Sequence, residues 1–255
     1  MRFSVLGSGS QGNSVYVESG TTAVLIDAGF SGKEIQRRLE SIGRDFSQIK
    51  ALCITHEHND HISGAGVVSR RYRIPVVINE KTLAAGCQKM GNLFATHIFT
   101  TGEILRLHDL EIRSFRISHD TADPVGFVIS DGSKSLGYCT DTGKSSRLIQ
   151  RRLSLCDAVV LEFNHDMEML KNGPYPLPLQ QRVRSNRGHL SNDDAGMLLA
   201  ELAEAGVHAV VLAHLSQKNN TEDLARKVAM DSLGPGTGIR LHVAHQDRAT
   251  ALLEI

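Results

Sequence analysis

The sequence predicts an α/β protein. Short apolar runs rich in β-branched residues, such as "DAVVLEF" at 157–163, alternate with helix-type patterns along most of the chain. Two predicted helices have recognisable starts, because Ser31 with Glu34 and Ser191 with Asp194 have the capping-box spacing that satisfies free backbone N–H groups. With 41% hydrophobic residues in a chain of 255, a full core can be buried.

The elements follow from these patterns in chain order. Apolar and β-branched runs predict strands at 2–7, 14–19, 22–27, 51–55, 75–78, 110–117, 125–130, 135–140, 157–163, 208–213, 239–244 and 249–254. Helical spacing between them predicts helices at 31–42, 62–72, 80–90, 145–154, 191–205 and 221–232. The segment 172–188 is expected to be a long irregular loop that could contain one helix. No linker interrupts the pattern, which predicts one domain over residues 1–255.

The composition disfavours several classes of protein. Lys and Arg number 28, as do Asp and Glu, so the formal net charge is zero and no overall field attracts nucleic acid or an anionic membrane. No apolar run approaches the roughly 18 residues of a membrane span, and the start lacks a signal-peptide pattern. We therefore expect a cytoplasmic protein with no membrane partner. The four cysteines form no C-x-x-C pair, which favours reduced, mostly buried thiols.

The most informative motif is "THEHNDH", directly after the apolar run "ALCI". In an extended segment His56 and His58 point to the same side, and Asp60 and His61 then follow a turn that Asn59 favours. Imidazole nitrogens and carboxylate oxygens are ligands for zinc, manganese and iron, and four within six residues can supply parts of two adjacent sites. A histidine-rich surface loop is the weaker alternative, because the motif ends a predicted strand and leads into a helix.

Three further ligand-type residues follow predicted strands. His119 in "RISHD", Asp141 in "GYCTDTG" and His214 in "VVLAHLS" each stand at the carboxyl end of an apolar run. Proteins of the α/β class build their sites at this edge of a sheet. Taken singly, each is an ordinary loop residue. Beside the histidine motif, they are candidates for the remaining ligands of a two-metal centre.

This series of residues resembles the ligand series of the metallo-β-lactamase superfamily, whose H-x-H-x-D-H pattern is matched at 56–61. The resemblance spans "LIDAG" to "LAHLS" and implies the four-layer αββα sandwich of that family. It implies that one metal ion is held by His56, His58 and His119 and the other by Asp60, His61 and His214. Asp141 would bridge the two ions. Asp27 in "LIDAG" is similar to the family's buried aspartate that supports the histidine motif, with a turn aspartate as the alternative.

Three segments narrow the resemblance. The opening "LGSGSQGNS", "LEFNHD" and "GHLSNDDAG" are similar to the WalJ/YycJ group of small bacterial nucleases, and more loosely to tRNase Z and the phosphonate-pathway cyclic phosphodiesterase. In the tRNase Z relatives a histidine that binds no metal helps proton transfer at the scissile phosphate, and His189 occupies that place here. Glu162 resembles its orienting partner, although an ordinary ion-paired carboxylate is the alternative.

Weaker candidates for substrate contacts border these motifs. The run "GSGSQG" matches G-x-G-x-x-G, but the strand-like "SVYVES" follows where a dinucleotide-binding motif needs a helix, so we reject that reading. We expect a tight turn between two strands, from which Ser10 and backbone N–H groups could approach a phosphate. Asn164, His165 and Arg187 are further candidate phosphate contacts beside the predicted site.

The leading hypothesis is a dinuclear metal-dependent phosphodiesterase, an exonuclease on DNA acting through a metal-bridging hydroxide. Its cofactors would be two divalent ions, manganese, zinc or iron, since the predicted ligands are all nitrogen and oxygen. Asp60 would hold the hydroxide, and His189, aided by Glu162, would protonate the leaving oxygen. The exonuclease action and the preference for DNA over RNA are what the WalJ/YycJ resemblance implies, and the sequence shows no long arm of the kind that tRNase Z uses to grip a large folded RNA. The sequence leaves the oligomeric state open.

Two other functions stay open. The same centre could hydrolyse a small thioester or lactone, as in the glyoxalase II and lactonase branches, although "GHLS" and the adjacent arginines disfavour this. Alternatively, the chain could be a metal-stabilised regulatory protein without turnover. The complete set of candidate ligands disfavours that alternative.

Overall fold

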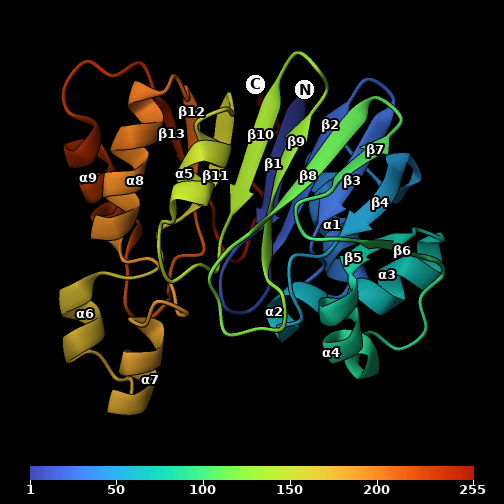
Figure 1. Ribbon diagram of the computed structural model, residues 1–255, viewed down its shortest axis with the longest axis horizontal. Helices are drawn as coiled ribbons and strands as arrows, with labels where there is room; N and C mark the ends of the chain where they lie inside the picture. The colour runs from blue at the N-terminus through green and yellow to red at the C-terminus, as the bar shows by residue number, and fades with distance from the viewer.

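Two mixed β-sheets pack face to face between layers of helices in the computed structural model, which describes residues 1–255 (Figure 1). The first sheet has the order β14-β1-β2-β3-β4-β5-β6. Its strands are Arg2–Gly7 (β1), Ser14–Ser19 (β2), Thr22–Ile26 (β3), Ile49–Cys53 (β4), Val76–Asn79 (β5), Thr96–Phe99 (β6) and Leu253–Glu254 (β14). Strands β3 to β6 run parallel, and the remaining pairs are antiparallel.

The second sheet has the order β13-β12-β11-β10-β9-β8-β7. Its strands are Ile104–Leu107 (β7), Leu110–Arg116 (β8), Val125–Ser130 (β9), Ser135–Cys139 (β10), Ala158–Glu162 (β11), Ala209–Ala213 (β12) and Arg240–Val243 (β13). Strands β10 to β13 are parallel, and β7 to β10 are antiparallel. Each sheet therefore has a parallel half, and the carboxyl ends of both halves reach the same end of the molecule.

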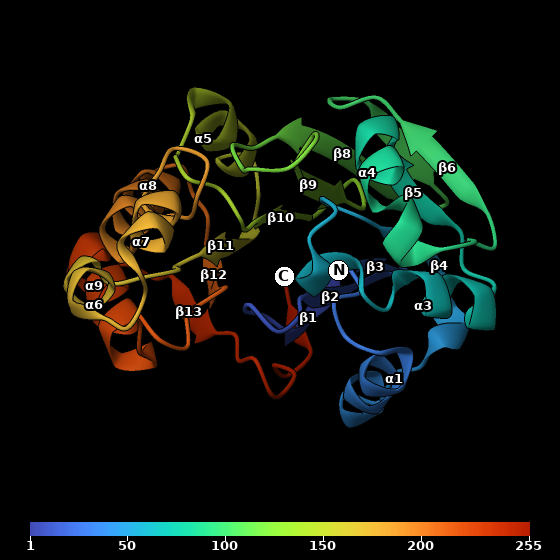
Figure 2. The same cartoon turned by 90° about the horizontal axis from the view of Figure 1, so that it is seen from below.

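Helices cover both outer faces of the sandwich. The helices are Gly32–Ser41 (α1), Asn59–Ile62 (α2), Ala65–Tyr72 (α3), Glu80–Met90 (α4), Arg147–Leu153 (α5), Met167–Asn172 (α6), Leu177–Val183 (α7), Asn192–Glu204 (α8) and Glu222–Leu233 (α9), with a 3₁₀ turn at Phe46–Gln48. Helices α1, α3 and α4 lie on the first sheet, and α5, α8 and α9 on the second (Figures 1 and 2). Helices α2, α6 and α7 lie at the end to which the parallel strands point.

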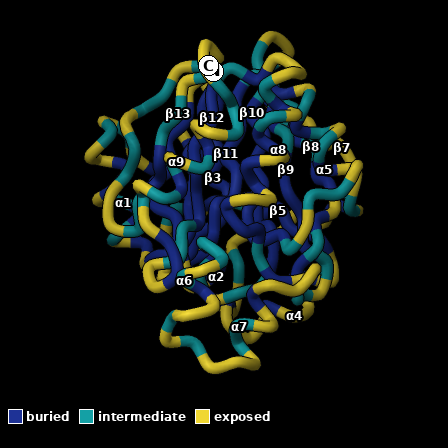
Figure 3. The backbone as a smooth tube through the Cα atoms, turned by 90° about the vertical axis from the view of Figure 1, so that its left-hand side faces the viewer, coloured by how far each residue is buried: buried dark blue, intermediate teal, exposed yellow.

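The apolar core has three layers that match this architecture. One buried cluster, with Phe3, Val24 and Tyr138, fills the space between the sheets. A second, with Leu161 and Leu199, joins the second sheet to its helices, and a third joins the first sheet to its own. Buried backbone accordingly runs through the centre of Figure 3, with exposed backbone around it. The predicted α/β sandwich is confirmed, whereas the single-domain division stays a prediction.

Several predicted boundaries are wrong for identifiable reasons. The helix predicted at 62–72 is divided, because the Gly64 N–H donates to the Ala28 carbonyl and α3 begins only after it. The strand predicted at 249–254 is reduced to β14 at its end, which pairs with β1. Earlier in this range the Val5 N–H donates to the Thr250 hydroxyl instead of to a backbone carbonyl, so the regular strand pairing does not extend there.

Four elements were not predicted. Strands β6 and β7 are short and largely exposed, so they carry no apolar run. Helix α6 has six residues, too few for a helical period, and the short helix α2 was expected to be a turn. Helix α7 lies within 172–188, where the sequence left room for one helix. Asp60 and His61, expected after a turn, lie inside the short helix α2.

Two further sequence expectations, the helix caps and the reduced, mostly buried cysteines, agree with the structure. Both predicted caps are present, with the Ser31 and Ser191 hydroxyls accepting from the N–H groups of Glu34 and Asp194. All four cysteines are free thiols and only Cys87 is exposed. None of the helices is both long and apolar enough to cross a bilayer.

Gly29 gives a test of how tightly the first sheet holds the histidine loop. A Cβ on this residue would collide with the backbone carbonyl of Asp60. We predict that Gly29→Ala lowers the free energy of unfolding by about 1–3 kcal/mol, as overpacking does, when measured by urea denaturation. Gly238→Ala is the control, because its Cβ meets no atom within 4 Å. Equal stability of the two variants would contradict this packing.

Candidate metal centre and active site

The ends of six strands supply the candidate site. Asp27 follows β3, the histidine loop follows β4, His119 follows β8, Asp141 follows β10, and His214 follows β12, while Glu162 is the last residue of β11. Three of the five non-glycine residues with positive φ belong to this group: Asp27 (59°), Asp141 (58°) and His214 (56°). Each such conformation costs of order 1–3 kcal/mol and persists only where the surroundings fix it. The backbone is therefore bent at these positions to bring their side chains to one point.

The first cluster consists of His56, His58 and His119, whose ligand atoms lie within 4.8 Å of one another. His119 Nδ1 donates to the Gly188 carbonyl (3.0 Å), so its Nε2 carries the lone pair and faces His58 Nδ1 at 3.2 Å. Burial lowers the pKa of all three imidazoles, assisted at His56 by the neighbouring His61. The cluster therefore presents neutral imidazoles, the form that binds a metal ion.

The second cluster consists of Asp60, His61, Asp141 and His214. His61 Nε2 lies 3.4 Å from Asp60 Oδ2 and 3.3 Å from Asp141 Oδ2. His214 Nε2 lies 3.6 Å from Asp60 Oδ2. The other oxygen of Asp141 is 3.8 Å from His119 Nε2, so this carboxylate stands between the two clusters.

Buried hydrogen bonds in the first sheet fix the two inner histidines. Both carboxylate oxygens of Asp27 accept from Thr55, one from its N–H and one from its hydroxyl, each at 2.8 Å. His61 Nδ1 donates to Asp27 at 2.7 Å. The Thr55 hydroxyl donates its only hydrogen to Asp27, so it accepts a hydrogen bond from His56 Nδ1 at 3.0 Å. Both imidazoles consequently turn Nε2 towards the centre. Asp27 thus lies behind the histidines, where the sequence analysis expected a supporting aspartate.

Glu162 has the corresponding place in the second sheet. Its Oε1 accepts from His189 Nδ1 (2.8 Å) and His214 Nδ1 (2.9 Å), and its Oε2 accepts from two backbone N–H groups. Burial by itself would raise the pKa of Glu162, but His189 and these hydrogen bonds outweigh it and lower the pKa to about 2. The predicted contact with His189 is present. The second contact, to His214, was not predicted.

The residues present fit a cation at each cluster. His56 Nε2, Asp141 Oδ2 and His214 Nε2 are buried and have no hydrogen-bond partner, which is rare for buried polar atoms. Burial alone would lower the pKa of His214, but Asp141, Asp60 and Glu162 raise it to about 10. The second cluster therefore favours positive charge at its centre, as protons or as metal ions in their place.

A cavity of about 200 Å³ opens onto both clusters. Asp60, Asp141, His189 and His214 line one side, and side chains of α7 with Tyr175 line the other. Figure 2 views the molecule from this end. The cavity is small and lined mostly by polar and charged side chains, so it suits a small charged group rather than a large apolar one.

The candidate substrate residues have different positions. Ser10 and Asn164 line the cavity, and the Asn164 amide donates to the His214 carbonyl at 2.9 Å. Arg187 is exposed and donates to the His119 carbonyl at 3.3 Å. His165 is 1% exposed, lies outside the cavity wall and has no partner for either ring nitrogen.

Sequence reasoning missed three supporting groups. Thr55 begins the quoted "THEHNDH" but was not assigned its role between Asp27 and His56. Asn13, within "LGSGSQGNS", donates to Asp60 Oδ2 at 3.1 Å. Asp120, directly after His119, accepts from Arg182 at 2.6 Å. Each lies within a quoted motif, which was the only available signal.

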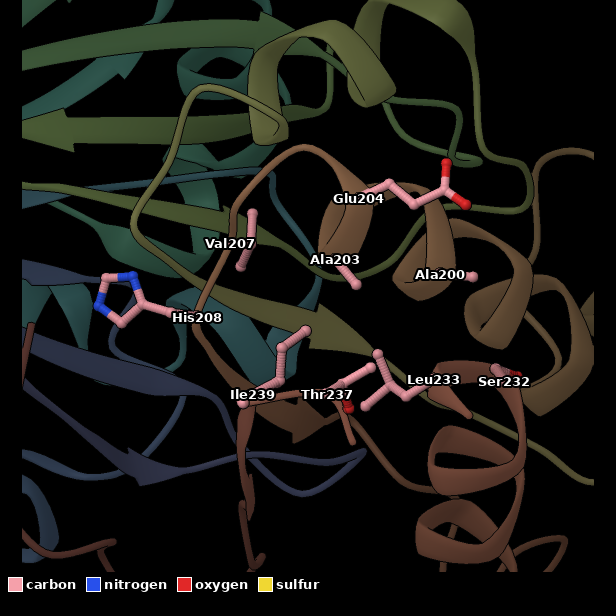
Figure 4. Close-up of a pocket in the computed structure, with 10 residues that line it drawn as sticks. Ala200, Ala203, Glu204, Val207, His208, Ser232, Leu233, Thr237 and Ile239 are labelled. Atoms are coloured by element: carbon pink, nitrogen blue, oxygen red, sulfur yellow. The ribbon is translucent and has the colours of Figure 1, made fainter. Parts of the chain in front are cut away.

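A larger cavity of about 390 Å³ lies elsewhere, between α8, α9 and the start of β13 (Figure 4). Val207 and His208 line it and precede β12, whereas His214 follows that strand. This cavity therefore lies at the opposite end of the second sheet and takes no part in the candidate site.

The sandwich and its two ligand clusters define a protein with a candidate two-metal hydrolytic centre. The chain belongs to the metallo-β-lactamase superfamily, because the profile described as "Metallo-beta-lactamase superfamily" matches residues 7–214. Membership of this superfamily confirms the expected class of hydrolase. The family and the two candidate ligand clusters together imply divalent metal ions.

Two relatives match most of the chain. "Exodeoxyribonuclease YycJ" of Bacillus anthracis is 36% identical over 249 residues, covering 95% of this chain and 94% of that protein. "Exodeoxyribonuclease WalJ" of Streptococcus pneumoniae is 37% identical over 263 residues, covering 100% and 98%. The resemblance to the WalJ/YycJ group is confirmed. The crystal structure of YhfI from Bacillus subtilis, at 18% identity, covers 98% of both chains with a TM-score of 0.76 and supports the fold.

The contacts of Asp27 predict its effect on metal affinity. In Asp27→Asn, one carboxylate oxygen becomes an NH₂ group, which cannot accept a hydrogen bond. Depending on its orientation, the amide loses the hydrogen bond from His61 Nδ1 or the one from the Thr55 N–H, so we expect divalent-metal affinity to fall about 10–100-fold. Competition with a chromophoric chelator measures this. Asp45→Asn, at an exposed helix cap, is the control. Metal affinity within twofold of the unmodified protein would contradict the supporting role.

Proposed function

We propose that this protein is a dinuclear metal-dependent phosphodiesterase that degrades DNA from an end. The observation that carries the proposal is the pair of ligand clusters joined by Asp141, with the His189 and Glu162 pair beside them in one polar cavity. The names of the two relatives support an exonuclease acting on DNA. We propose a cytoplasmic location on the sequence evidence alone.

In this proposal His56, His58 and His119 would hold one ion, and Asp60, His61 and His214 the other. Asp141 would contact both. Nitrogen and oxygen donors of this kind suit manganese, zinc or iron. When bound, the two ions supply an activated water and neutralise charge on the phosphate oxygens.

The protein's own groups would orient water and move a proton. Asp60 Oδ2 faces the two histidines of its cluster, which leaves Oδ1 to accept a hydrogen bond from the attacking water. His189 Nδ1 is held by Glu162, so its Nε2 is the atom that would donate a proton to the leaving oxygen. The hydrogen bond to Glu162 would hold the imidazole in the orientation that this transfer needs.

Separate variants test the two roles. Asp141→Ala should abolish phosphodiester hydrolysis and lower the bound metal, since it removes the carboxylate between the clusters. His189→Gln should lower kcat about 10²–10⁴-fold, as loss of a general acid does, while bound metal stays unchanged. Mass spectrometry of metal content and bis(p-nitrophenyl) phosphate turnover measure both. Loss of metal from His189→Gln would make this histidine a ligand and contradict its assignment.

The choice of substrate needs its own experiment. Protein stripped of metal and restored with Mn²⁺ or Zn²⁺ should shorten end-labelled DNA progressively from one end, and Asp141→Ala should not. A thioester and a lactone, the substrates of the alternative hydrolase, should stay intact. Cleavage of either with intact DNA would keep the metal centre and overturn the nuclease function. No hydrolysis of any substrate would favour the regulatory alternative.

A further inference from the structure

Five exposed cationic side chains lie beside the candidate site on two adjoining segments: Lys144, Arg147, Arg151, Arg184 and Arg187. We call this set the basic rim. None of the five forms an ion pair, whereas Arg182 next to them is paired with Asp120. In a chain of zero net charge, these cations make a local concentration of uncompensated positive charge.

Hydrogen bonds hold the two segments together. The loop after β10 and the loop after α7 meet where Gly143 packs against the backbone of Asn186. Ser118 joins them, because its carbonyl accepts from the Gly143 N–H and its hydroxyl donates to the Asn186 carbonyl at 2.6 Å. Helix α5 begins directly afterwards, capped by Ser146. Lys144 and Arg147 are thereby placed next to the segment that carries Arg184 and Arg187.

The basic rim begins at the metal centre itself. Arg187 donates to the carbonyl of the candidate ligand His119, and the Thr142 N–H donates to Glu162. From there the rim extends along α5, where Arg147 and Arg151 are four residues apart and share a helix face, about 6 Å apart along the axis. Figure 2 shows α5 and α7 on the same side of the centre.

We propose that the basic rim binds the phosphate backbone of the DNA strand where it leads away from the linkage that is cleaved. The inference rests on the proposed function, and it assigns the direction in which the DNA leaves the site, past the loop after α7 and along α5. Unpaired guanidinium and ammonium groups at successive positions are the groups that contact successive phosphates. The zero net charge does not prevent DNA binding if these five charges act on one strand locally.

The double variant Lys144→Gln with Arg147→Gln tests the basic rim. Equilibrium binding of a fluorescent 20-base-pair duplex, followed by anisotropy between 50 and 200 mM KCl, should show a salt slope smaller by about 1.8, from about 0.9 per lost phosphate contact. Between 50 and 200 mM KCl, the DNA affinity of the double variant should therefore decrease by a factor about ten times smaller than that of the unmodified protein. Hydrolysis of the small ester thymidine 5′-p-nitrophenyl phosphate, which is too short to reach the rim, should change less than twofold.

The matched control is Lys50→Gln with Arg240→Gln. Both residues are exposed, form no ion pair, and lie near the amino ends of β4 and β13, at the opposite end of the sheets. If both pairs of substitutions give the same salt slope, the basic rim does not bind DNA and the inference is overturned. If the unmodified protein hydrolyses neither DNA nor the small ester, the proposed function is overturned. The anisotropy measurement would still show whether the basic rim binds DNA.

Discussion

The site depends on one buried carboxylate in each sheet. Asp27 at the end of β3 fixes His61 directly and His56 through Thr55, and Glu162 at the end of β11 fixes His214 and His189. Both carboxylates are completely buried, so each must be satisfied by several donors. Those donors include the Nδ1–H groups of His61, His189 and His214, and Thr55 and two backbone N–H groups supply the others. These hydrogen bonds offset the free-energy cost of burying the two carboxylates. They also orient His61 and His214, and His56 through Thr55, so that the Nε2 atom of each ring faces the centre.

This arrangement explains why the sandwich suits such a site. The parallel halves of both sheets end at one edge, and a left-handed residue after β3, β10 and β12 bends the chain there. The strained backbone and the unpartnered ligand atoms both cost free energy, which the three apolar layers must offset. A bound cation would remove part of that cost by taking the place of missing hydrogen-bond partners.

Much of the fold could be predicted because the inner strands and helices have strong patterns. Runs such as "DAVVLEF" and capped helices such as α8 were located to within a few residues. Elements without such patterns could not be predicted: β6 and β7 are exposed edge-side strands, and α6 is very short. For the site, residue types at strand ends indicated the candidate ligands that the fold brings together. Asp27 and Glu162 were expected as supporting carboxylates through the family resemblance. Thr55, Asn13 and Asp120 could not be found from the sequence, because they are common loop residues whose roles depend on folded contacts.

The central claim is that two metal ions occupy two ligand sets joined by Asp141. Crystals grown with Mn²⁺ and measured at the manganese absorption edge test it most directly. We predict two anomalous peaks, one bonded to His56, His58 and His119 and the other to Asp60, His61 and His214, with Asp141 touching both. A single peak, or a peak bonded to His189 or His165, would contradict it.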